Sequence, residues 1–315
     1  MLDSNFQLLT SNIQLPISMI TVVGTGALAS LFASRLALHT PITMFGSWRE
    51  AIEAINTKGL ILEDDSGSRA FRVKATRDVS ECVGTELALV VVKSYQTEKV
   101  AKEIKKFLSP DGVALTLQNG LGNYEALANE LGEERVAQGV AMQGANMIEA
   151  GRVRDGGKGS IHVAEHPRLT KWVDVLRKAN IEVHESPIIN LQSLIWNKLL
   201  INVPINPLTG ILRLTNGELL NNEEALQIAD QAVSECLAVM VAKCITPPRQ
   251  SPHDRYREVL SNTSANRSSM FQDILRGAQT EIESINGAVV REGKKLGVPT
   301  SINETLYCLV KAMTL

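Results

Sequence analysis

The sequence predicts an α/β protein in which a doubly wound sheet precedes an all-helical C-terminal domain. Up to Pro187, strand-like runs alternate with helical patterns, which is typical of a parallel sheet covered by helices. Beyond Pro187, strand-like runs disappear and long helical periods take over. We therefore expect a leader over residues 1–18, a sheet domain over residues 19–187 and a helical domain over residues 188–315, with the functional site in the cleft between the two domains.

Residue patterns place the elements of the sheet domain. Ile20–Val23 is a short β-branched run that a helical pattern follows. Residues 87–92 are apolar throughout, as expected for a parallel strand buried on both faces. The runs 60–62 and 71–73 flank Asp64–Gly67, which predicts a hairpin. Further strands are expected at 42–45, 113–117 and 136–142, and helices at 50–58 and up to about residue 107.

One stretch of the helical domain carries the most specific pattern. Lys198, Asn202 and Asn206 follow one another at steps of four, so a helix would present all three on one face. A cation beside amides can hold a polar oxygen that gains negative charge. Pro204 lies within this helix and can kink the turn that carries Asn206. The opposite, apolar stripe should face a core; it consists of Trp196, Leu199, Leu200 and Val203.

A second long helix is expected near the C-terminus. Residues 269–295 keep a helical period, and Gly297 with Pro299 should end it.

Composition and charge exclude several classes of protein. The chain is 44% hydrophobic and 21% charged, which is typical of a soluble globular protein, and no apolar run approaches the roughly 20 residues of a membrane span. The net charge of −2 gives no reason to expect a nucleic acid or an anionic membrane as partner. Residues 1–18 lack the basic start of a secretory signal, so we expect a cytoplasmic protein, and a homodimer stays open.

No metal site is expected from the sequence. The four cysteines lack zinc-binding spacing. His162 and His166 are four residues apart, but their surroundings are typical of a strand and a loop.

The first strand runs directly into a glycine-rich turn of the Rossmann type. The pattern G-x-G-x-x-A falls on Gly24, Gly26 and Ala29, with Thr25, Ala27 and Leu28 between them. Gly24 permits the tight turn, Gly26 lets the backbone approach a pyrophosphate, and Ala29 lets the helix pack close to the strand. The helix N-terminus then offers unpaired N–H groups to the phosphates. We therefore expect these six residues to bind a dinucleotide.

The end of the second strand favours NADP(H) over NAD(H). A carboxylate commonly binds the ribose 2′-hydroxyl of NAD at this point, but here the sequence is Phe45-Gly46-Ser47-Trp48-Arg49. Ser47 and Arg49 could hold a 2′-phosphate instead, since the planar guanidinium bonds two oxygens at once. An ordinary solvated arginine is the alternative.

Several motifs in a fixed order resemble the ketopantoate reductase (2-dehydropantoate 2-reductase) family. They extend over almost the whole chain from Met19, and the ordered set is more specific than the glycine turn alone. The motifs are the turn at 24–29, Val92–Gln96, Gln118–Gly122, Trp196–Leu199, Asn206–Thr209, Asn216–Leu219, Ser268–Asp273 and Thr280–Gly287.

This resemblance implies an oxidoreductase that uses NADPH to reduce 2-dehydropantoate, a small 2-oxo acid, to (R)-pantoate on the route to pantothenate and coenzyme A. It implies that Lys198 is the general acid. Asn119 is expected near both the nicotinamide and the substrate, and Glu281 near Lys198 and the cofactor.

The resemblance also implies the groups that bind substrate and cofactor. Asn202 and Asn206 are expected to bind substrate oxygens, and Ser269 the substrate carboxylate. Lys93 and Gln96 match the loop beside the bound nucleotide.

Alternatives stay open at this point. The substrate could be another 2-oxo or 3-hydroxy acid, or the chain could be a nucleotide-binding sensor without turnover. Such a sensor should have lost Lys198 or Glu281, and both are present. Ser268 and Ser269 could simply cap the helix that follows, and Glu281 and Glu283 could be a solvated pair.

Overall fold

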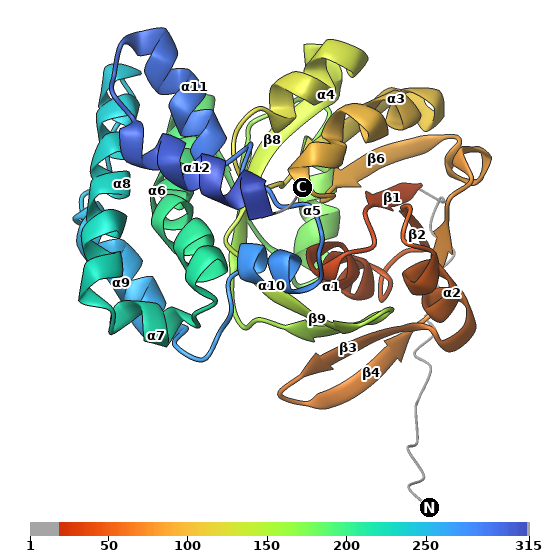
Figure 1. Ribbon diagram of the computed structural model, residues 1–315. Helices are drawn as coiled ribbons and strands as arrows, with labels where there is room; N and C mark the ends of the chain where they lie inside the picture. Colours follow the sequence, from red (N-terminus) through yellow and green to blue (C-terminus); the bar gives the residue numbers. More distant parts are fainter. Residues whose placement is uncertain (1–18, 314–315) are drawn as a thin grey trace, which may run out of the picture. The chain divides into compact units, whose positions relative to one another are not determined.

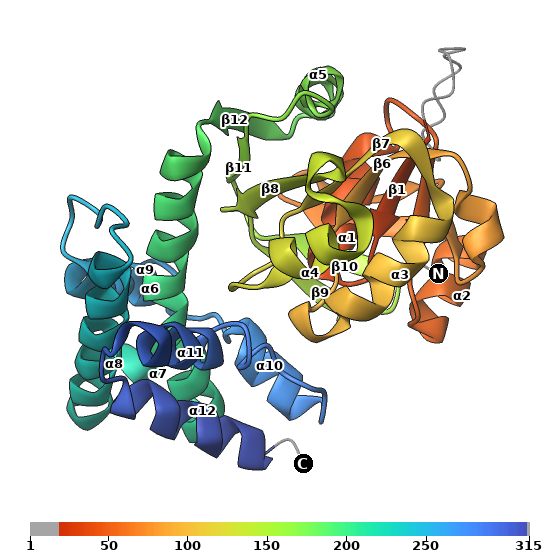
Figure 2. The same cartoon turned by 90° about the horizontal axis from the view of Figure 1, so that it is seen from above.

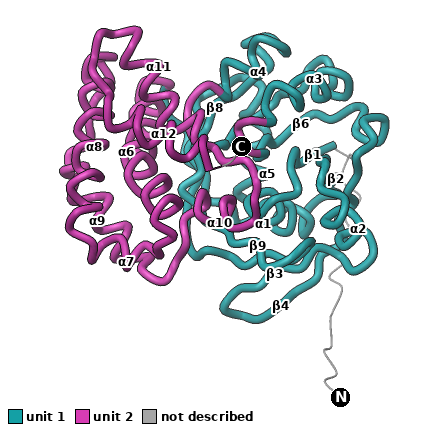
Figure 3. The backbone as a smooth tube through the Cα atoms, in the orientation of Figure 1, with its two compact units in different colours: residues 1–92, 96–118, 123–187 teal, residues 93–95, 119–122, 188–315 magenta. Residues whose placement is uncertain are grey.

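The computed structural model describes residues 19–313 (Figure 1). The expected leader, residues 1–18, lies outside the described residues. The chain divides into two compact units, coloured separately in Figure 3. Within the described residues, unit 1 takes in 19–92, 96–118 and 123–187, and unit 2 takes in 93–95, 119–122 and 188–313.

Unit 1 is built on an eight-stranded sheet. Its strands run in the order β12-β11-β8-β7-β6-β1-β2-β5, and all neighbours are parallel except β8 and β11. The order reverses at β1, so the prediction of a doubly wound sheet is confirmed. The strands are β1 (Ile20–Val23), β2 (Ile42–Phe45), β5 (Lys74–Thr76), β6 (Thr85–Val90), β7 (Leu108–Thr116), β8 (Val136–Ala141), β11 (Ser160–Ala164) and β12 (Glu182–Ser186).

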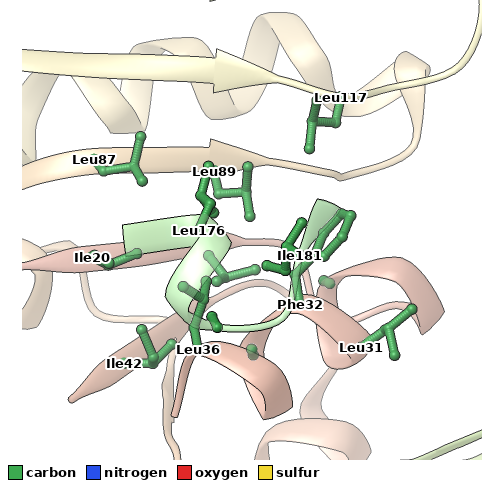
Figure 4. Close-up of a cluster of buried hydrophobic side chains, with 14 of the residues drawn as sticks. Ile20, Leu31, Phe32, Leu36, Ile42, Leu87, Leu89, Leu117, Leu176 and Ile181 are labelled. Atoms are coloured by element: carbon green, nitrogen blue, oxygen red, sulfur yellow. The ribbon is translucent and has the colours of Figure 1, made fainter. Parts of the chain in front are cut away.

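Helices bury both faces of this sheet. Helices α1 (Ala27–Leu36) and α5 (Thr170–Lys178) share one apolar cluster with Leu87 and Leu89 of β6. Helices α3 (Thr97–Phe107) and α4 (Asn123–Leu131) share another with Ala88 and Val90 of the same strand. Figure 4 shows the first cluster, which includes Leu87 and Leu89 of β6 together with Phe32 and Leu36 of α1. Because alternate residues of a strand point to opposite faces, β6 is apolar throughout, as predicted.

A four-stranded sheet lies against the other side of α1, in the order β4-β3-β10-β9. Strands β3 (Leu60–Asp64) and β4 (Gly67–Phe71) form a hairpin as predicted, but the second strand ends at Phe71, where the expected run 71–73 begins, so Asp64 and Gly67 are themselves paired. Gly67 has a positive φ of 112°. Strands β9 (Ala145–Glu149) and β10 (Arg152–Asp155) were not expected, since both are short. Helix α2 (Arg49–Lys58) begins one residue earlier than predicted and ends at Gly59.

Unit 2 is all-helical, as predicted, and helix α6 runs through its centre. Helix α6 (Ile188–Leu212) contacts α7, α8, α9, α10 and α12 (Figure 2). The predicted apolar stripe from Trp196 to Val203 is fully buried. The other helices are α7 (Asn216–Leu220), α8 (Glu223–Ala242), α9 (Pro252–Asn262), α10 (Ser269–Leu275), α11 (Asn286–Leu296) and α12 (Ser301–Met313).

Among the described residues, α8 alone is long and apolar enough to cross a membrane, judged by length and composition. One face of α8 is buried in the helical core through Val233, Cys236 and Met240. A core helix of a globular protein meets the same criteria.

The prediction of one helix over residues 269–295 is wrong. Helix α10 ends at Leu275, and Gly277 follows with a left-handed φ of 61°. Gly277 N–H donates to the carbonyl of Ile274, and Ala278 N–H donates to that of Asp273. These two bonds form a Schellman motif, which ends a helix by satisfying its last carbonyls. The segment from Gly277 to Ile285 is therefore outside regular helix, and it carries Glu281.

Two prolines lie inside α6, yet the helix continues to Leu212. Pro207 has no N–H, so the carbonyl of Val203 loses its usual helical partner. The side chain of Asn286 replaces it, since Nδ2 donates to this carbonyl at 3.0 Å. The same Nδ2 donates to Asn303 on α12, whose own Nδ2 donates to the carbonyl of Ala232 and to the carboxylate of Glu235 on α8. A chain of buried amides thus links α6, α11, α12 and α8.

Asn286→Ala should lower the free energy of unfolding by about 1–3 kcal/mol, because it leaves buried hydrogen-bonding groups without partners. Urea denaturation followed by far-UV circular dichroism measures this difference. Asn262→Ala removes an exposed asparagine at the end of α9 and serves as the control, with little expected change. Equal stability of the two variants would contradict a structural role for the amide chain.

Candidate active site

The glycine turn of unit 1 leaves open space before the first turn of α1. Gly24 has a φ of 134°, and a Cβ there would lie 3.3 Å from the Cβ of Ala29 and from the backbone of Val91. Gly26 is exposed, and a Cβ at this position would meet no atom within 4 Å. Gly26 is also the N-cap of α1 and has no side-chain cap, and the first turn contains no acidic residue. The first N–H groups of α1 at Ala27 and Leu28 are therefore open to an anion.

The segment after β2 lies beside this turn. Thr25 packs on Gly46, where a Cβ would come within 2.8 Å of the threonine methyl group. Ser47 and Arg49 are both exposed, and Arg49 is the first residue of α2. Among the residues that the structure describes, no carboxylate lies within ion-pair distance of Arg49. Because the helix dipole disfavours a cation at this end, an anion bound there would be stabilised both by the helix and by the guanidinium.

Unit 2 contains the predicted lysine and asparagines on α6. Lys198 and Asn202 are half-buried, and Asn206 is only 6% exposed. The helix is continuous through Asn206, so the spacing of four residues is kept despite Pro204. Within the described part of the chain, the carboxamide of Asn206 has no hydrogen-bond partner. A buried amide is normally paired, so this side chain is suited to a polar ligand.

Several charged side chains gather around Glu281 in the same unit, and the two carboxylates among them are buried. Lys93 Nζ lies 2.6 Å from Asp273 Oδ2 and 3.7 Å from Glu281 Oε2. The backbone N–H of Ser94 donates to Glu281 Oε1 at 3.0 Å. Asp273 also accepts a hydrogen bond from Arg276 at 2.8 Å. Asp273 and Glu281 are 2% and 5% exposed, so both carboxylates depend on these donors for stabilisation.

The two lysines near Glu281 respond differently to their surroundings. Burial lowers the pKa of Lys198 to about 8, and the negative charge of Glu281 only partly opposes this effect. Burial also acts on Lys93, but Glu281 and Asp273 together outweigh it and raise the pKa of that ammonium. Lys93 therefore stays charged, whereas Lys198 can lose its proton near neutral pH.

Glu281 and Glu283 are not a solvated pair. Glu281 is buried, as described above, whereas Glu283 is partly exposed and pairs with Arg291, Tyr307 and Lys311. The two glutamates thus face different surroundings although only one residue separates them.

The serines at the start of α10 also differ in position. Ser268 caps the helix by accepting a hydrogen bond from the N–H of Phe271, and it receives another from Thr209 at 2.7 Å. The capping alternative therefore holds for Ser268. Ser269 is exposed at the first helical position, where its hydroxyl is accessible to a ligand.

Two loops that follow strands of unit 1 pack within unit 2 and carry the remaining predicted residues. The loop 93–95 contains Lys93, and Gln96 follows it, partly exposed, at the start of α3. The loop 119–122 begins with Asn119, which is partly exposed. Both loops extend from the carboxyl ends of parallel strands, where doubly wound proteins bind their ligands.

Three residues of this cluster were missed from the sequence: Asp273, Ser94 and Ser284. Asp273 is the last residue of the motif Ser268–Asp273 and lies four residues after Ser269. On a helix this spacing places the two side chains on one face, and it was the signal that the sequence offered. The two serines gave no such signal, because their partners lie far away in the sequence.

Two models of one known protein family match most of this chain. The family model described as "Ketopantoate reductase PanE/ApbA" matches residues 20–168, and its C-terminal counterpart matches residues 190–314. The chain therefore belongs to the ketopantoate reductase family. A 2-dehydropantoate 2-reductase of Archaeoglobus fulgidus is 33% identical over 299 residues, which cover 93% of this chain and 97% of that protein.

Solved structures of similar proteins share the fold. A PanE/ApbA family ketopantoate reductase from Ralstonia eutropha superposes with a TM-score of 0.87 at 29% identity, covering 94% of this chain and 98% of that one. D-mandelate dehydrogenase in a ternary structure with NADH and anilino(oxo)acetate gives a TM-score of 0.87 at 25% identity, with the same coverage. These likenesses support an oxidoreductase with a Rossmann-type unit.

Glu281→Gln should lower the pKa of Lys198 below about 8, because it removes the negative charge that favours the ammonium. An NMR titration of the lysine ε-methylene groups, with Lys198 assigned by substitution, measures this shift. Glu283→Gln is the matched control, since its partners are Arg291, Tyr307 and Lys311. An unchanged Lys198 titration in Glu281→Gln would show that the carboxylate does not act on the lysine.

Proposed function

We propose that this protein uses NADPH to reduce 2-dehydropantoate to (R)-pantoate, the reaction that serves pantothenate and coenzyme A biosynthesis. The observation that carries the proposal is the half-buried lysine Lys198 on α6, whose pKa is lowered by burial to about 8 although the negative charge of Glu281 opposes this effect. Membership of the ketopantoate reductase family supports the same activity.

The residues of the glycine turn fit a dinucleotide. The open space at Gly26 and the uncapped start of α1 suit a pyrophosphate. Thr25, Ala27 and Leu28 complete the turn, and Gly24 with Ala29 sets its close packing. A reduced nicotinamide nucleotide bound there would supply the hydride. Ser47 and Arg49 would hold the 2′-phosphate that distinguishes NADPH from NADH.

Lys198 would act as the general acid. A ketone that receives a hydride develops negative charge on its oxygen, and an ammonium at that oxygen stabilises the charge and delivers a proton. With a pKa of about 8, the ammonium is present at neutral pH and still acidic enough to give up its proton. The buried carboxylate of Glu281 favours this charged form. The reduction should therefore slow as the pH rises through the pKa of Lys198.

The remaining polar groups would bind the substrate. Asn202 and Asn206 follow Lys198 on one helix, and the buried amide of Asn206 has hydrogen-bonding capacity to offer. Ser269 would meet the substrate carboxylate, and Asn119 would lie near both nicotinamide and substrate. Lys93 and Gln96 would lie beside the bound nucleotide, although the ammonium of Lys93 already forms an ion pair with Asp273.

A different 2-oxo acid is the second candidate. D-mandelate dehydrogenase, whose structure was determined with NADH and anilino(oxo)acetate, shares the fold of this chain at 25% identity. Turnover with a panel of 2-oxo acids, each with NADPH and NADH, separates the two candidates. A protein that binds NADPH but reduces none of them would be a nucleotide-binding sensor.

Lys198→Ala should lower kcat by about 10²–10⁴-fold, the usual contribution of general acid catalysis. NADPH affinity, measured by fluorescence titration, should change little. Lys295→Ala, at a solvent-exposed position on α11, should keep the wild-type rate. A wild-type rate in Lys198→Ala would remove this lysine from the acid role.

Arg49→Ala should weaken NADPH binding about tenfold or more, because it removes a charge-assisted contact with phosphate, and should leave NADH binding nearly unchanged. Dissociation constants for both nucleotides measure the effect. Arg72→Ala changes another exposed arginine of unit 1 and provides the control. If both nucleotides lost affinity equally in Arg49→Ala, the arginine would not recognise the 2′-phosphate.

A further inference from the structure

Ser284 lies where three segments of unit 2 meet. It follows Glu281 by three residues and is 5% exposed. The loops 93–95 and 119–122, which carry Lys93 and Asn119, both form hydrogen bonds to it. No step of the proposed reaction uses this serine.

The hydroxyl of Ser284 binds the first loop. Its Oγ lies 2.8 Å from Ser94 Oγ and 3.0 Å from the backbone carbonyl of Glu281. The backbone N–H of Ser94 in turn donates to the side chain of Glu281 at 3.0 Å. A closed ring of hydrogen bonds therefore runs from Ser284 through Ser94 to the carboxylate of Glu281 and back through its main chain.

The backbone of Ser284 binds the second loop. Its carbonyl accepts a hydrogen bond from the N–H of Leu121 at 2.9 Å. Gly120 approaches so closely that a Cβ there would collide with this carbonyl and lie 2.6 Å from the hydroxyl of Ser284. Gly120 also has a positive φ of 80°, so glycine is required here for two reasons. Asn119 directly precedes it.

We propose that Ser284 is a positioning residue that fixes the Glu281 carboxylate beside Lys93 and Lys198 by holding the loops 93–95 and 119–122 against it. This inference rests on the proposed function, since it concerns the acid step of the reduction. The carboxylate of Glu281 can rotate about its terminal side-chain torsion. The hydrogen bond from the N–H of Ser94 fixes one orientation of this carboxylate, provided that the loop 93–95 stays in place.

The charged and titratable groups around this carboxylate come from three segments. Lys93 and Tyr95 lie on the first loop, Lys198 lies on α6, and Asp273 and Arg276 lie at the end of α10. Glu281 is the anion that raises the pKa of Lys198 against the effect of burial. If Glu281 is held less firmly, this pKa should fall, and the fraction of protonated acid at a given pH should fall with it.

The test compares Ser284→Ala with the control Ser34→Ala. Ser34 is another buried serine, and its hydroxyl donates a hydrogen bond to the carbonyl of Leu31 on α1. The pH dependence of kcat is measured with NADPH and 2-dehydropantoate. In Ser284→Ala the falling alkaline limb should move to lower pH, and kcat at neutral pH should drop about two- to tenfold, as expected for one lost hydrogen bond. Ser34→Ala should keep the wild-type profile.

Ser94→Ala removes the partner hydroxyl and should reproduce the shift of the alkaline limb. The double variant should be no worse than the more affected single variant, because both substitutions break the same hydrogen-bond ring. The proposal would be overturned if the fold-reductions in kcat of the two single variants multiplied in the double variant. It would also be overturned if kcat of Ser284→Ala declined at the same alkaline pH as kcat of the wild type.

Hydrogen–deuterium exchange gives a readout that needs no turnover. The amides of Ser94 and Leu121 should exchange faster in Ser284→Ala than in the wild type, while peptides of α12 should not change. Faster exchange with an unchanged pH profile would reduce Ser284 to a purely structural role and overturn the proposal. A wild-type protein that reduces no 2-oxo acid would instead overturn the proposed function, and the exchange rates would still show whether Ser284 holds the loops.

Discussion

The structure of the candidate site depends on one buried carboxylate that acts on two lysines. Glu281 has almost no exposure to water, so its charge must be stabilised by protein groups. Lys93, the backbone N–H of Ser94 and the charge of Lys198 supply this stabilisation. Each of these groups comes from a segment that is distant in the sequence, so the carboxylate and the local fold support each other.

The break between α10 and α11 makes this arrangement possible. If residues 269–295 formed one straight helix, Asp273 and Glu281 would be about 12 Å apart along its axis, at 1.5 Å of rise for each residue. The Schellman motif at Gly277 turns the chain instead, and both carboxylates reach the ammonium of Lys93. A glycine in the helix-terminating position thus decides where the charges meet.

Much of this could be read from the sequence, for identifiable reasons. The doubly wound sheet followed from apolar strands and the glycine turn, and the buried face of α6 followed from its helical period. The break at Gly277 was missed because the helical period of the flanking residues continues across it, although the glycine itself was visible. Strands β9 and β10 were missed because both are short, and the ion pair of Arg152 with Glu63 joins residues that are far apart in the sequence. The contacts of Asp273 and Ser284 depend on tertiary structure, and no local pattern encodes them.

The amide chain through Asn286 makes two distant positions of the sequence interdependent. A residue with an N–H in place of Pro207 would offer the carbonyl of Val203 its ordinary helical donor, which would then compete with the asparagine for the same oxygen. The effect of a change at either position should therefore depend on which residue occupies the other, although 79 residues of sequence separate them. A protein that keeps only one member of the pair would have either a buried carbonyl without its donor or a buried amide that competes for an acceptor already in use.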